Sequence, residues 1–373
     1  MNTIDRTIDQ AIVEQLHDII AARIKSGELS PGDKILSERE LCEAYHVSRT
    51  TARNALLTLE NEGFVTRITG SGTYVRDPRP GPQFDSASTG TIGFILCRHH
   101  YPVRTLREDY FYFEVMEGIH AELKTKGGHL LTCYSDKEGE DEKALADLAG
   151  KVDGVILGEA QSEGLLREAV RMRLPCVLVN PSVDHVRFDF DTFTIDNVAG
   201  AYKAVQHLVS LGHSAIGCIQ GPMDAHSACN RFEGYRHALA EAGIPFRPEL
   251  VEPAENWTIE QGVATIQALL ARSPGISAVF CANDTLAVGA VKGLAGTHAV
   301  PDDVSVVGFD DYTIAAHNTP ALTTVRSPIL EQGRQACAQL LSRIGGVRMP
   351  VTSVMLSPDL IVRESTRPPR AGR

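Results

Sequence analysis

A proline-rich segment near residue 80 constrains the fold of this 373-residue chain more than any other feature. Residues 77–89 read Asp-Pro-Arg-Pro-Gly-Pro-Gln-Phe-Asp-Ser-Ala-Ser-Thr, with three prolines in five positions followed by small polar residues. This composition favours an extended linker that has no hydrophobic core of its own. We therefore expect a small domain at residues 1–76, a linker at residues 77–90 and a larger domain at residues 91–366.

The composition is that of an ordinary globular protein, since 43% of the residues are hydrophobic and 22% are charged. No window approaches the ~18 uninterrupted apolar residues of a membrane span, and residues 1–6 do not resemble a secretory signal. We therefore expect a soluble, cytoplasmic protein. The eight cysteines fit this compartment, because they show no Cys-x-x-Cys pair and no zinc-ligand spacing.

The start of the chain shows the pattern of two helices. Apolar residues recur on one helical face of the first segment, at Ile8, Ile12, Leu16, Ile19 and Ile20. A second helix is expected after Ser37, because Ser37 and Glu40 form a capping-box pattern. Leu41 and Ala44 would face inward from this helix.

A third helix and a β-hairpin complete the small domain. Ser48 is the expected N-cap of the third helix, whose buried stripe is Ala52, Leu56 and Leu59. Residues 64–75 then read as a β-hairpin with a glycine-rich turn. The order of helix, helix, turn, helix and hairpin is that of a winged helix-turn-helix.

The third helix offers hydrogen-bond donors that suit DNA bases and phosphates. These side chains belong to Ser48, Arg49, Thr50, Thr51 and Arg53. Gly72 would let the backbone of the hairpin approach DNA closely. The net charge is −11, and residues 1–79 hold 10 Lys and Arg against 12 Asp and Glu. DNA contact must therefore come from a few well-placed side chains and not from a basic domain.

Four stretches of the small domain resemble the GntR family of DNA-binding domains. They are LSPGDKILSEREL at residues 29–41, YHVSRTTARNAL at 45–56, LENEG at 59–63 and GSGTYV at 70–75. The resemblance implies DNA contacts at Arg39, Ser48, Arg49, Thr50, Thr51, Arg53 and Gly72. Leu36 departs from the proline that is usual in the family, which changes the rigidity of the turn but removes no contact.

From residue 91 onward, short apolar runs alternate with helical stretches. The runs are expected strands, at residues 92–97, 130–133, 155–157, 176–179, 216–219, 278–281 and 304–307. Strands that are apolar on both faces and linked by helices predict α/β architecture with parallel sheets. A segment of this length favours two lobes. In such sheets, ligands bind outside the carboxyl ends of the strands.

Polar residues cluster just after these expected strands. They are Asn180, Asp196, Asn197, Ser227, Arg231, Asn283, Asp284, Asp310 and Asp311. Each residue alone fits a helix cap or a turn, because Asp, Asn and Ser are common there. Their recurrence at one end of the sheets favours a binding site instead.

The larger domain resembles the LacI/GalR repressors, whose effector domain is similar to periplasmic sugar-binding proteins. The resemblance covers about residues 91–365 and includes VDGVIL at 152–157, HLVSLGH at 207–213, RFEGY at 231–235, CAND at 281–284, VPDDVSVVGFDD at 300–311 and PALTTV at 320–325. It implies that an effector binds between two lobes of a periplasmic-binding-protein-like fold.

The resemblance also implies an effector-binding set of Tyr112, Phe113, Asn180, Ser227, Arg231, Trp257, Asn283 and Asp310. Trp257 would stack on the C–H face of a sugar ring. Ala225 stands where purine-binding relatives carry arginine, which argues against a purine effector. Asn180 replaces an aspartate of some relatives, and residues 77–89 stand in place of the LacI-type hinge helix.

A GntR-like reader joined to a LacI-like sensor is the architecture of the hybrid arabinose repressors. The sequence therefore predicts a regulator that represses transcription as a homodimer on a palindromic operator. A sugar, with the pentose L-arabinose as the best single candidate, would bind the cleft and release the DNA. No cofactor, metal or membrane partner is expected.

Two alternatives remain: a cytoplasmic sugar-binding protein without DNA function, and an enzyme of sugar metabolism. An enzyme is disfavoured because His99, His100, Cys133 and His226 show no ligand pairing with a carboxylate in range. The chain also lacks a nucleophile elbow and a P-loop. A sugar-binding protein of a transporter would need a signal peptide and would leave residues 1–76 without a purpose.

Overall fold

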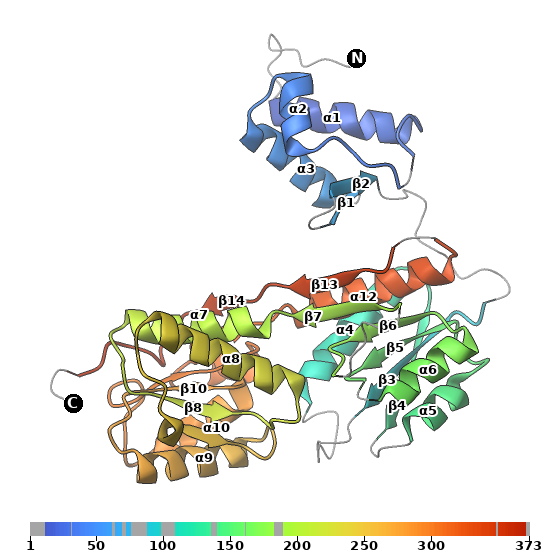
Figure 1. The fold of residues 1–373 in the computed structure, drawn as a ribbon. Coiled ribbons are helices and arrows are strands. Elements are labelled where there is room, and N and C mark those ends of the chain that lie inside the picture. Colours follow the sequence, from blue (N-terminus) through green and yellow to red (C-terminus); the bar gives the residue numbers. More distant parts are fainter. Residues whose placement is uncertain are drawn as a thin grey trace. The chain divides into compact units, whose positions relative to one another are not determined.

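The computed structural model forms two compact units, Met1–Gln83 and Phe84–Arg373 (Figure 1). It describes residues 12–30, 32–61, 64–68, 72–75, 88–97, 109–135, 140–160, 162–182, 189–347 and 350–370. Most of the expected linker and the turn of the expected hairpin lie outside these residues, and so does Ile8. The expected fold class, α/β with an N-terminal winged helix-turn-helix, is confirmed by the elements described below.

The N-terminal unit consists of three helices and a two-stranded antiparallel sheet in the part of the chain that the structure describes. These elements are α1 (Ile12–Lys25), α2 (Glu38–Tyr45), α3 (Arg49–Asn61), β1 (Val65–Ile68) and β2 (Gly72–Val75). Leu16, Leu41 and Leu59 are fully buried between them, because one apolar stripe from each helix faces the same centre.

Local hydrogen bonds explain where α2 and α3 begin. The Ser37 hydroxyl accepts from the backbone N–H of Glu40 at 3.3 Å, and the Glu40 carboxylate accepts from the N–H of Ser37 at 2.7 Å. This capping box is the one predicted from the sequence. The predicted cap of α3 is also confirmed, since the Ser48 hydroxyl accepts from the N–H of Thr51 at 3.1 Å. Ala44 was expected to face inward but is exposed.

The larger unit has two lobes, each built on a parallel sheet. The first lobe holds a six-stranded sheet of order β13-β7-β6-β5-β3-β4 among the described residues. Its elements are β3 (Thr91–Cys97), α4 (Tyr110–Lys124), β4 (His129–Ser135), α5 (Asp141–Leu148), β5 (Gly154–Gly158), α6 (Glu163–Met172), β6 (Cys176–Val179), β7 (Asp191–Ile195), α12 (Ile329–Ile344) and β13 (Ser353–Leu356).

The second lobe holds a four-stranded parallel sheet of order β11-β10-β8-β9 within the described part of the chain. Its elements are α7 (Asn197–Ser210), β8 (Ile216–Gln220), α8 (His226–Glu241), β9 (Val251–Pro253), α9 (Ile259–Arg272), β10 (Ala278–Cys281), α10 (Asp284–Leu294), β11 (Ser305–Val307), α11 (Thr313–His317), β12 (Thr324–Arg326) and β14 (Asp359–Ile361). β12 and β14 form a small antiparallel pair.

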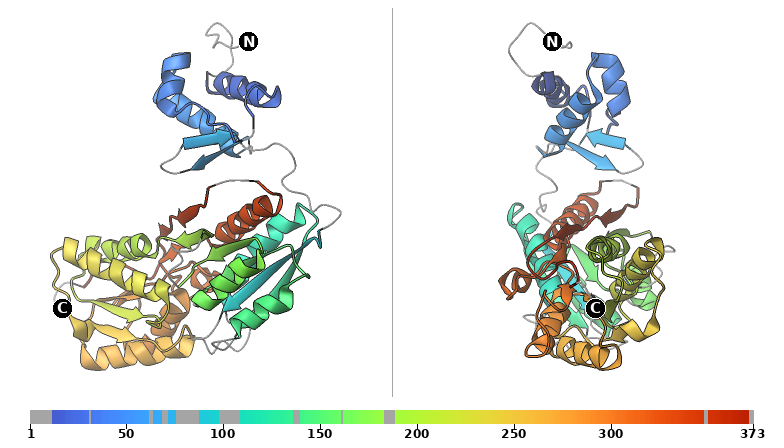
Figure 2. Two further views of the ribbon diagram at one scale, coloured as in Figure 1. Left: turned by 45° about the vertical axis from the view of Figure 1, so that its right-hand side comes forward. Right: turned by 90° about the vertical axis from the view of Figure 1, so that its left-hand side faces the viewer.

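The chain passes between the two lobes three times. It leaves the first lobe between β7 and α7, returns between β12 and α12, and leaves again between β13 and β14. Helices cover both faces of each sheet (Figure 2). In the first lobe α4 and α12 pack on one face and α5 and α6 on the other, so the sheet is buried on both sides.

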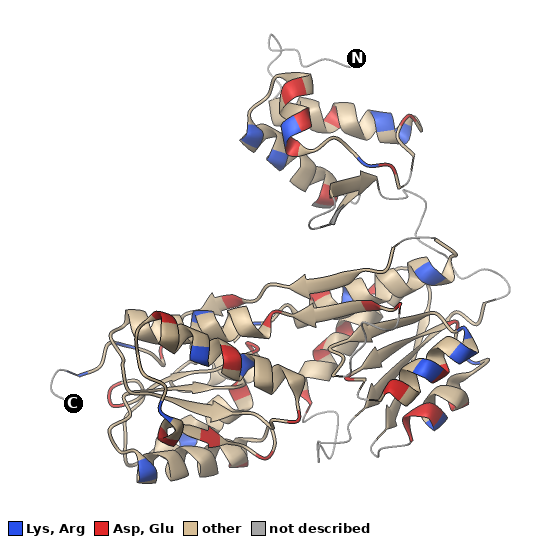
Figure 3. Ribbon diagram, viewed as in Figure 1, with Lys and Arg blue, Asp and Glu red and all other residues tan. Residues whose placement is uncertain are grey.

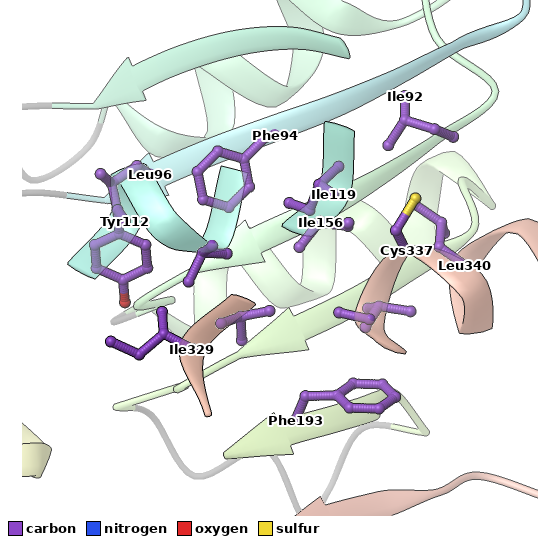
Figure 4. Close-up of a cluster of buried hydrophobic side chains, with 14 of the residues drawn as sticks. Ile92, Phe94, Leu96, Tyr112, Ile119, Ile156, Phe193, Ile329, Cys337 and Leu340 are labelled. Carbon is purple, nitrogen blue, oxygen red and sulfur yellow. The ribbon is translucent and has the colours of Figure 1, made fainter. Parts of the chain in front are cut away.

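The cores of the lobes are apolar, and the charges lie on the helices around them. Figure 4 shows one cluster of the first lobe, in which the rings of Phe94 and Tyr112 lie 6.2 Å apart between centroids. Lys and Arg alternate with Asp and Glu over the helices of both units (Figure 3). Cys176 and Cys281 are buried as expected from their apolar surroundings, and burial raises the pKa of both thiols. Among the described residues, no helix is long and apolar enough to span a membrane.

Candidate DNA-binding surface and effector cavity

The side chains expected to contact DNA lie at the start of α3 and beside it. Ser48, Thr50 and Arg53 are exposed, and Thr51 is half-buried because its hydroxyl lies 2.8 Å from that of Ser48. The side chains of Arg49 and Arg39 are 85% and 84% exposed. Exposed donors at the start of a helix are available to the bases and phosphates of a DNA groove.

Both exposed arginines are paired with glutamates of α2. Arg49 Nε lies 3.3 Å from an Oε of Glu38, and Arg39 Nε lies 3.9 Å from an Oε of Glu43. Exposed ion pairs of this kind contribute little to stability. The two guanidinium groups therefore form only weak ion pairs, which DNA phosphates could replace.

Gly72 makes room for a lysine side chain at the start of β2. A Cβ at this position would lie 2.5 Å from Cε of Lys34. The backbone at Gly72 also has φ of +137°, a conformation that L side chains rarely adopt. Ile35 N–H donates to the Thr73 carbonyl at 2.8 Å, and Lys34 forms an isolated antiparallel bridge with Tyr74 of β2. The glycine thus brings an exposed lysine to the hairpin.

A cavity of about 390 Å³ lies between the two lobes of the larger unit. Seven of the eight expected effector-binding residues line it, namely Tyr112, Asn180, Ser227, Arg231, Trp257, Asn283 and Asp310. They come from the carboxyl ends of strands in both sheets and from the first turns of the helices that follow. This position is the one expected for ligands of parallel sheets.

Phe113 is the expected residue that the structure does not bring to the cavity. It lies on α4 next to Tyr112, and its side chain is 51% exposed. The side chain of Tyr112 is buried in the cavity wall, whereas that of the next residue, Phe113, is largely exposed to solvent. Tyr110 and Phe111 line the cavity instead. The expectation for Phe113 is therefore corrected.

Arg231 and Asp310 form a buried ion pair in the wall of the cavity. The two Nη atoms of Arg231 lie 3.0 and 2.8 Å from the two Oδ atoms of Asp310, and each residue is only 4% exposed. Arg231 also donates to Oδ1 of Asn197 at 2.8 Å and to the carbonyl of Ala282 at 2.6 Å. The described residues thus accept four of its five N–H groups, which leaves one on Nη2 for a ligand.

Two aromatic rings lie near this guanidinium. Its Cζ lies 3.8 Å from the centroid of the Phe309 ring and 5.9 Å from that of Trp257. The edge of the Trp257 indole lies against Gly221, where a Cβ would be 2.1 Å from Cη2. The glycine therefore allows the indole to lie along the wall of the cavity as a flat apolar surface, which suits the C–H face of a sugar ring.

Asn283 serves as a helix cap and as a cavity residue at once. Its Oδ1 accepts from the N–H of Leu286 at 2.9 Å. Because this bond uses the oxygen, the amide nitrogen is the group that remains for a ligand. From the sequence, capping a helix is an alternative to binding a ligand at Asn283. The structure allows one side chain to do both.

Strained backbone occurs around the cavity. Glu159, Asn180 and Asp310 have φ of 53°, 47° and 99°, and all three line the cavity. Positive φ is uncommon outside glycine and gathers at functional sites, where the surrounding structure enforces it. At Asp310 the conformation directs the carboxylate back toward Arg231.

The sequence missed several cavity residues. Glu159 follows β5 directly and was detectable by the same rule that identified Asn180. Tyr110 and Tyr312 stack across the lobes with ring centroids 5.3 Å apart, and nothing in the sequence predicts this contact. Of the other clustered polar residues Asn197 lines the cavity, whereas Asp196, Asp284 and Asp311 do not.

The pKa of one carboxyl group on α4 depends on charges of the second lobe. Burial and the nearby carboxylates of Asp310 and Asp311 raise the pKa of Glu114 to about 7. Burial also raises the pKa of Asp284, although its carboxylate accepts from the Thr324 hydroxyl and from the N–H of Tyr312. No group of three or more metal-ligating side chains occurs among the described residues.

Known proteins match both units of the chain. Residues 12–75 match the model of bacterial regulatory proteins of the gntR family, and residues 205–366 match a periplasmic binding protein-like domain. The arabinose metabolism transcriptional repressor of Geobacillus stearothermophilus is 30% identical over 366 residues, which are 95% of this chain and 97% of that protein. The chain belongs to the hybrid family of transcriptional regulators with a GntR-type DNA-binding domain and a LacI-type effector domain.

Other relatives and solved structures match about three quarters of this regulator or more. The transcriptional regulator CelR of Thermobifida fusca is 32% identical over 280 residues, which are 74% of this chain and 81% of that protein. A solved CelR–cellobiose complex covers 95% of this chain and 100% of its own, with a TM-score of 0.68 and 27% identity. A LacI family regulator from Enterococcus faecium with bound ribose covers 75% and 100%, with a TM-score of 0.66 and 27% identity.

Proposed function

We propose that this regulator represses transcription by binding an operator, and that a sugar in the cavity between the lobes releases it. The observation that carries the proposal is the polar and aromatic cavity in a chain that also holds a winged helix-turn-helix. A relative named for arabinose metabolism and two solved structures that hold cellobiose and ribose support a sugar. The cavity volume of about 390 Å³ is at the lower end of the range for small-molecule sites.

We take the pentose L-arabinose as the first candidate effector. The relative that matches both units along nearly their whole length is an arabinose metabolism repressor. With L-arabinose bound in the cavity, Trp257 would lie under the sugar ring, and the sugar hydroxyl groups would form hydrogen bonds with Arg231, Asn283 and Asp310. The roles of these residues toward a ligand are part of the proposal.

A homodimer is the second part of the proposal. Two copies of the winged helix would read the two halves of a palindromic operator, as paired readers of this type do. The larger units would hold the dimer together. Residues 77–90 would act as the linker that lets the readers adjust to the spacing of the half-sites.

Closure of the lobes is the switch that we propose. A ligand that contacts both lobes favours the closed state, and closure changes the distance between the attachment points of the two linkers. The ligand can bias the operator equilibrium only by its differential affinity, which in allosteric proteins is typically about 1–3 kcal/mol. Reciprocity then requires the operator to weaken sugar binding by the same factor.

The test is a titration of L-arabinose into the purified regulator with and without operator DNA at fixed salt. We expect the sugar to bind more weakly when operator is present. Tighter binding would show a corepressor and contradict release. A thermal-shift panel of pentoses, hexoses and disaccharides identifies another sugar if L-arabinose does not bind, because a ligand of the folded state raises apparent stability.

We propose that the protein has no catalytic role. The purified protein, sugar and DNA of the titration also test this point. An enzyme of sugar metabolism would consume the sugar during the titration, and a sugar-binding protein without DNA function would give no gel shift with the upstream DNA. We also propose that this regulator works in the cytoplasm, where it would reach operator DNA.

A further inference from the structure

A buried glutamine lies directly behind one residue of the cavity wall. Gln332 is on α12 in the first lobe and is fully buried. Its Nε2 donates to Oδ1 of Asn180 at 2.8 Å and to the carbonyl of Phe193 at 2.9 Å. Asn180 lines the cavity at the end of β6, whereas Gln332 does not reach the cavity.

The Phe193 carbonyl fixes which way both amides point. A backbone carbonyl can only accept, and this one also accepts from the N–H of Asn180 at 3.0 Å. Gln332 must therefore direct its NH₂ group, and not its oxygen, toward Phe193. The second proton of that NH₂ group then meets Asn180, which must present its oxygen to Gln332. The NH₂ group of Asn180 is left as the group that can serve the cavity.

The backbone and the packing hold this arrangement. Asn180 has φ of 47°, a left-handed conformation that asparagine tolerates better than most residues. Gln332 is fixed by α12, which lies against β6 and β7. Oε1 of Gln332 is buried and has no hydrogen-bond partner among the described residues. An apolar side chain would avoid this cost, so packing alone does not explain a glutamine here.

We propose that Gln332 is a positioning residue that makes Asn180 present a hydrogen-bond donor to the ligand. This inference rests on the proposed sugar effector and adds a rule for its recognition. At position 180 the NH₂ group of asparagine donates, so it selects a ligand oxygen that accepts a hydrogen bond. An aspartate carboxylate at the same position would instead require a ligand group that donates. The amide pair thus sets the polarity of one subsite.

The ligand test uses L-arabinose and its monodeoxy and deoxyfluoro analogues in calorimetry. A C–F group accepts a hydrogen bond weakly and cannot donate one, and a deoxy position does neither. At one position of the sugar, we expect the fluoro analogue to bind wild-type protein more tightly than the deoxy analogue. In Asn180→Asp this order should reverse at the same position, because fluorine then faces a carboxylate. The same order in both proteins overturns the proposal.

The variant Gln332→Met separates positioning from packing. Methionine fills a similar volume but makes neither hydrogen bond, so the Asn180 amide is free to turn. We expect L-arabinose to bind about five- to tenfold more weakly, as for the loss of one hydrogen bond. The difference between the fluoro and deoxy analogues should also shrink. A melting temperature lowered with that difference intact would show a merely structural role and overturn the proposal.

A pKa measurement on the protein without ligand tests the amide orientation whatever sugar the protein binds. In Asn180→Asp, the NH₂ group of Gln332 would donate to the new carboxylate and lower its pKa. Adding Gln332→Met should therefore raise the pKa of that carboxyl in a ¹³C NMR titration. An unchanged pKa would contradict the assigned amide orientation. If L-arabinose does not bind wild-type protein, the sugar assignment fails while this titration still decides the orientation.

Discussion

Two arginine–carboxylate pairs mark the two functional regions, and their surroundings differ greatly. In the DNA-binding unit, Arg49 lies 3.3 Å from Glu38 with 85% of its side chain exposed. In the effector cavity, Arg231 lies 2.8 Å from Asp310 with 4% of its side chain exposed. The first pair is screened by water and salt, whereas the second is desolvated and has further hydrogen bonds to protein groups.

This difference teaches how each site is built. The side chains proposed to bind DNA are exposed to solvent, so replacing one should leave the fold intact. The cavity side chains are already part of the fold, since Arg231 alone ties together Asn197, Ala282 and Asp310. A substitution in the cavity should therefore change stability and ligand binding together.

The largest effect is expected when one member of the buried pair is removed. Arg231→Ala should lower the free energy of unfolding of the larger unit by about 3–5 kcal/mol, because the Asp310 carboxylate is left buried without its counter-charge. It should also abolish the response to the sugar. Chemical denaturation and calorimetry on the same samples measure both quantities.

The double variant Arg231→Met/Asp310→Leu separates these two effects. It removes both charges, so much of the stability should return while sugar binding stays absent. If the double variant binds the sugar like wild type, the ion pair is structural and the assigned cavity residues are wrong.

The next largest effect is expected at the exposed arginine. Arg49→Ala should weaken specific operator binding by about 1–3 kcal/mol, as for the loss of a good base or phosphate contact. The free energy of unfolding should change by less than about 0.5 kcal/mol, since the side chain is exposed. Arg167→Ala is a matched control, because Arg167 is 70% exposed and pairs with Glu163 on a helix of the larger unit. Equal operator binding by all three proteins would break the comparison.

Helix α4, which supplies Tyr112 to the cavity wall, is also expected to carry a pH-sensitive group. The pKa of Glu114 is raised from 4.5 to about 7, so its carboxyl is protonated in both states below pH 4.5. Between these values only the unfolded chain loses the proton, and stability falls as the pH rises through the window. Glu114→Gln should therefore stabilise the protein by about 1 kcal/mol at pH 8, allowing for partial exposure, and hardly at all at pH 4.5.

Thermal unfolding at the two pH values measures this difference. Glu117→Gln, on the exposed face of the same helix, is the control. A gain at pH 8 that is equal for both variants would show a general effect of charge and not of the neighbouring aspartates.

The sequence predicted the residues of each site with unequal success, for a physical reason. In the N-terminal unit, caps and apolar stripes are local patterns, so Ser37, Ser48 and Leu59 take the places expected of them. Ala44 failed because a small apolar side chain is tolerated on either face of a helix. The DNA contacts themselves stay predictions.

In the larger unit, the strand ends predicted where the cavity lies but not how its walls are arranged. The polar residue after a strand was visible in the sequence, as at Asn180. The direction of its amide depends on Gln332, which lies 152 residues away in the chain. The sequence also did not show which side of α4 faces the cavity. Tyr112 lies in the cavity wall, whereas the next residue, Phe113, is exposed to solvent.

The smallest effect should come from the partner of the exposed arginine. Glu38→Gln removes the charge that Arg49 faces and keeps the size of the side chain. Operator binding should strengthen by at most about fivefold, because an exposed ion pair is worth only about 0–1 kcal/mol and must be broken before Arg49 reaches DNA.

The effect of Glu38→Gln should shrink as salt is added, since water and ions already screen this pair at 3.3 Å. Gel-shift titrations at two salt concentrations measure it, and Glu43→Gln beside Arg39 provides the same change of net charge at the longer distance of 3.9 Å. Equal strengthening by both variants would mean that the added net charge acts on the phosphate backbone as a whole. Strengthening by Glu38→Gln alone would mean that the glutamate competes with DNA for Arg49. The exposed pair would then act as a gate on DNA binding, in contrast to the buried pair, which is fixed into the wall of the cavity.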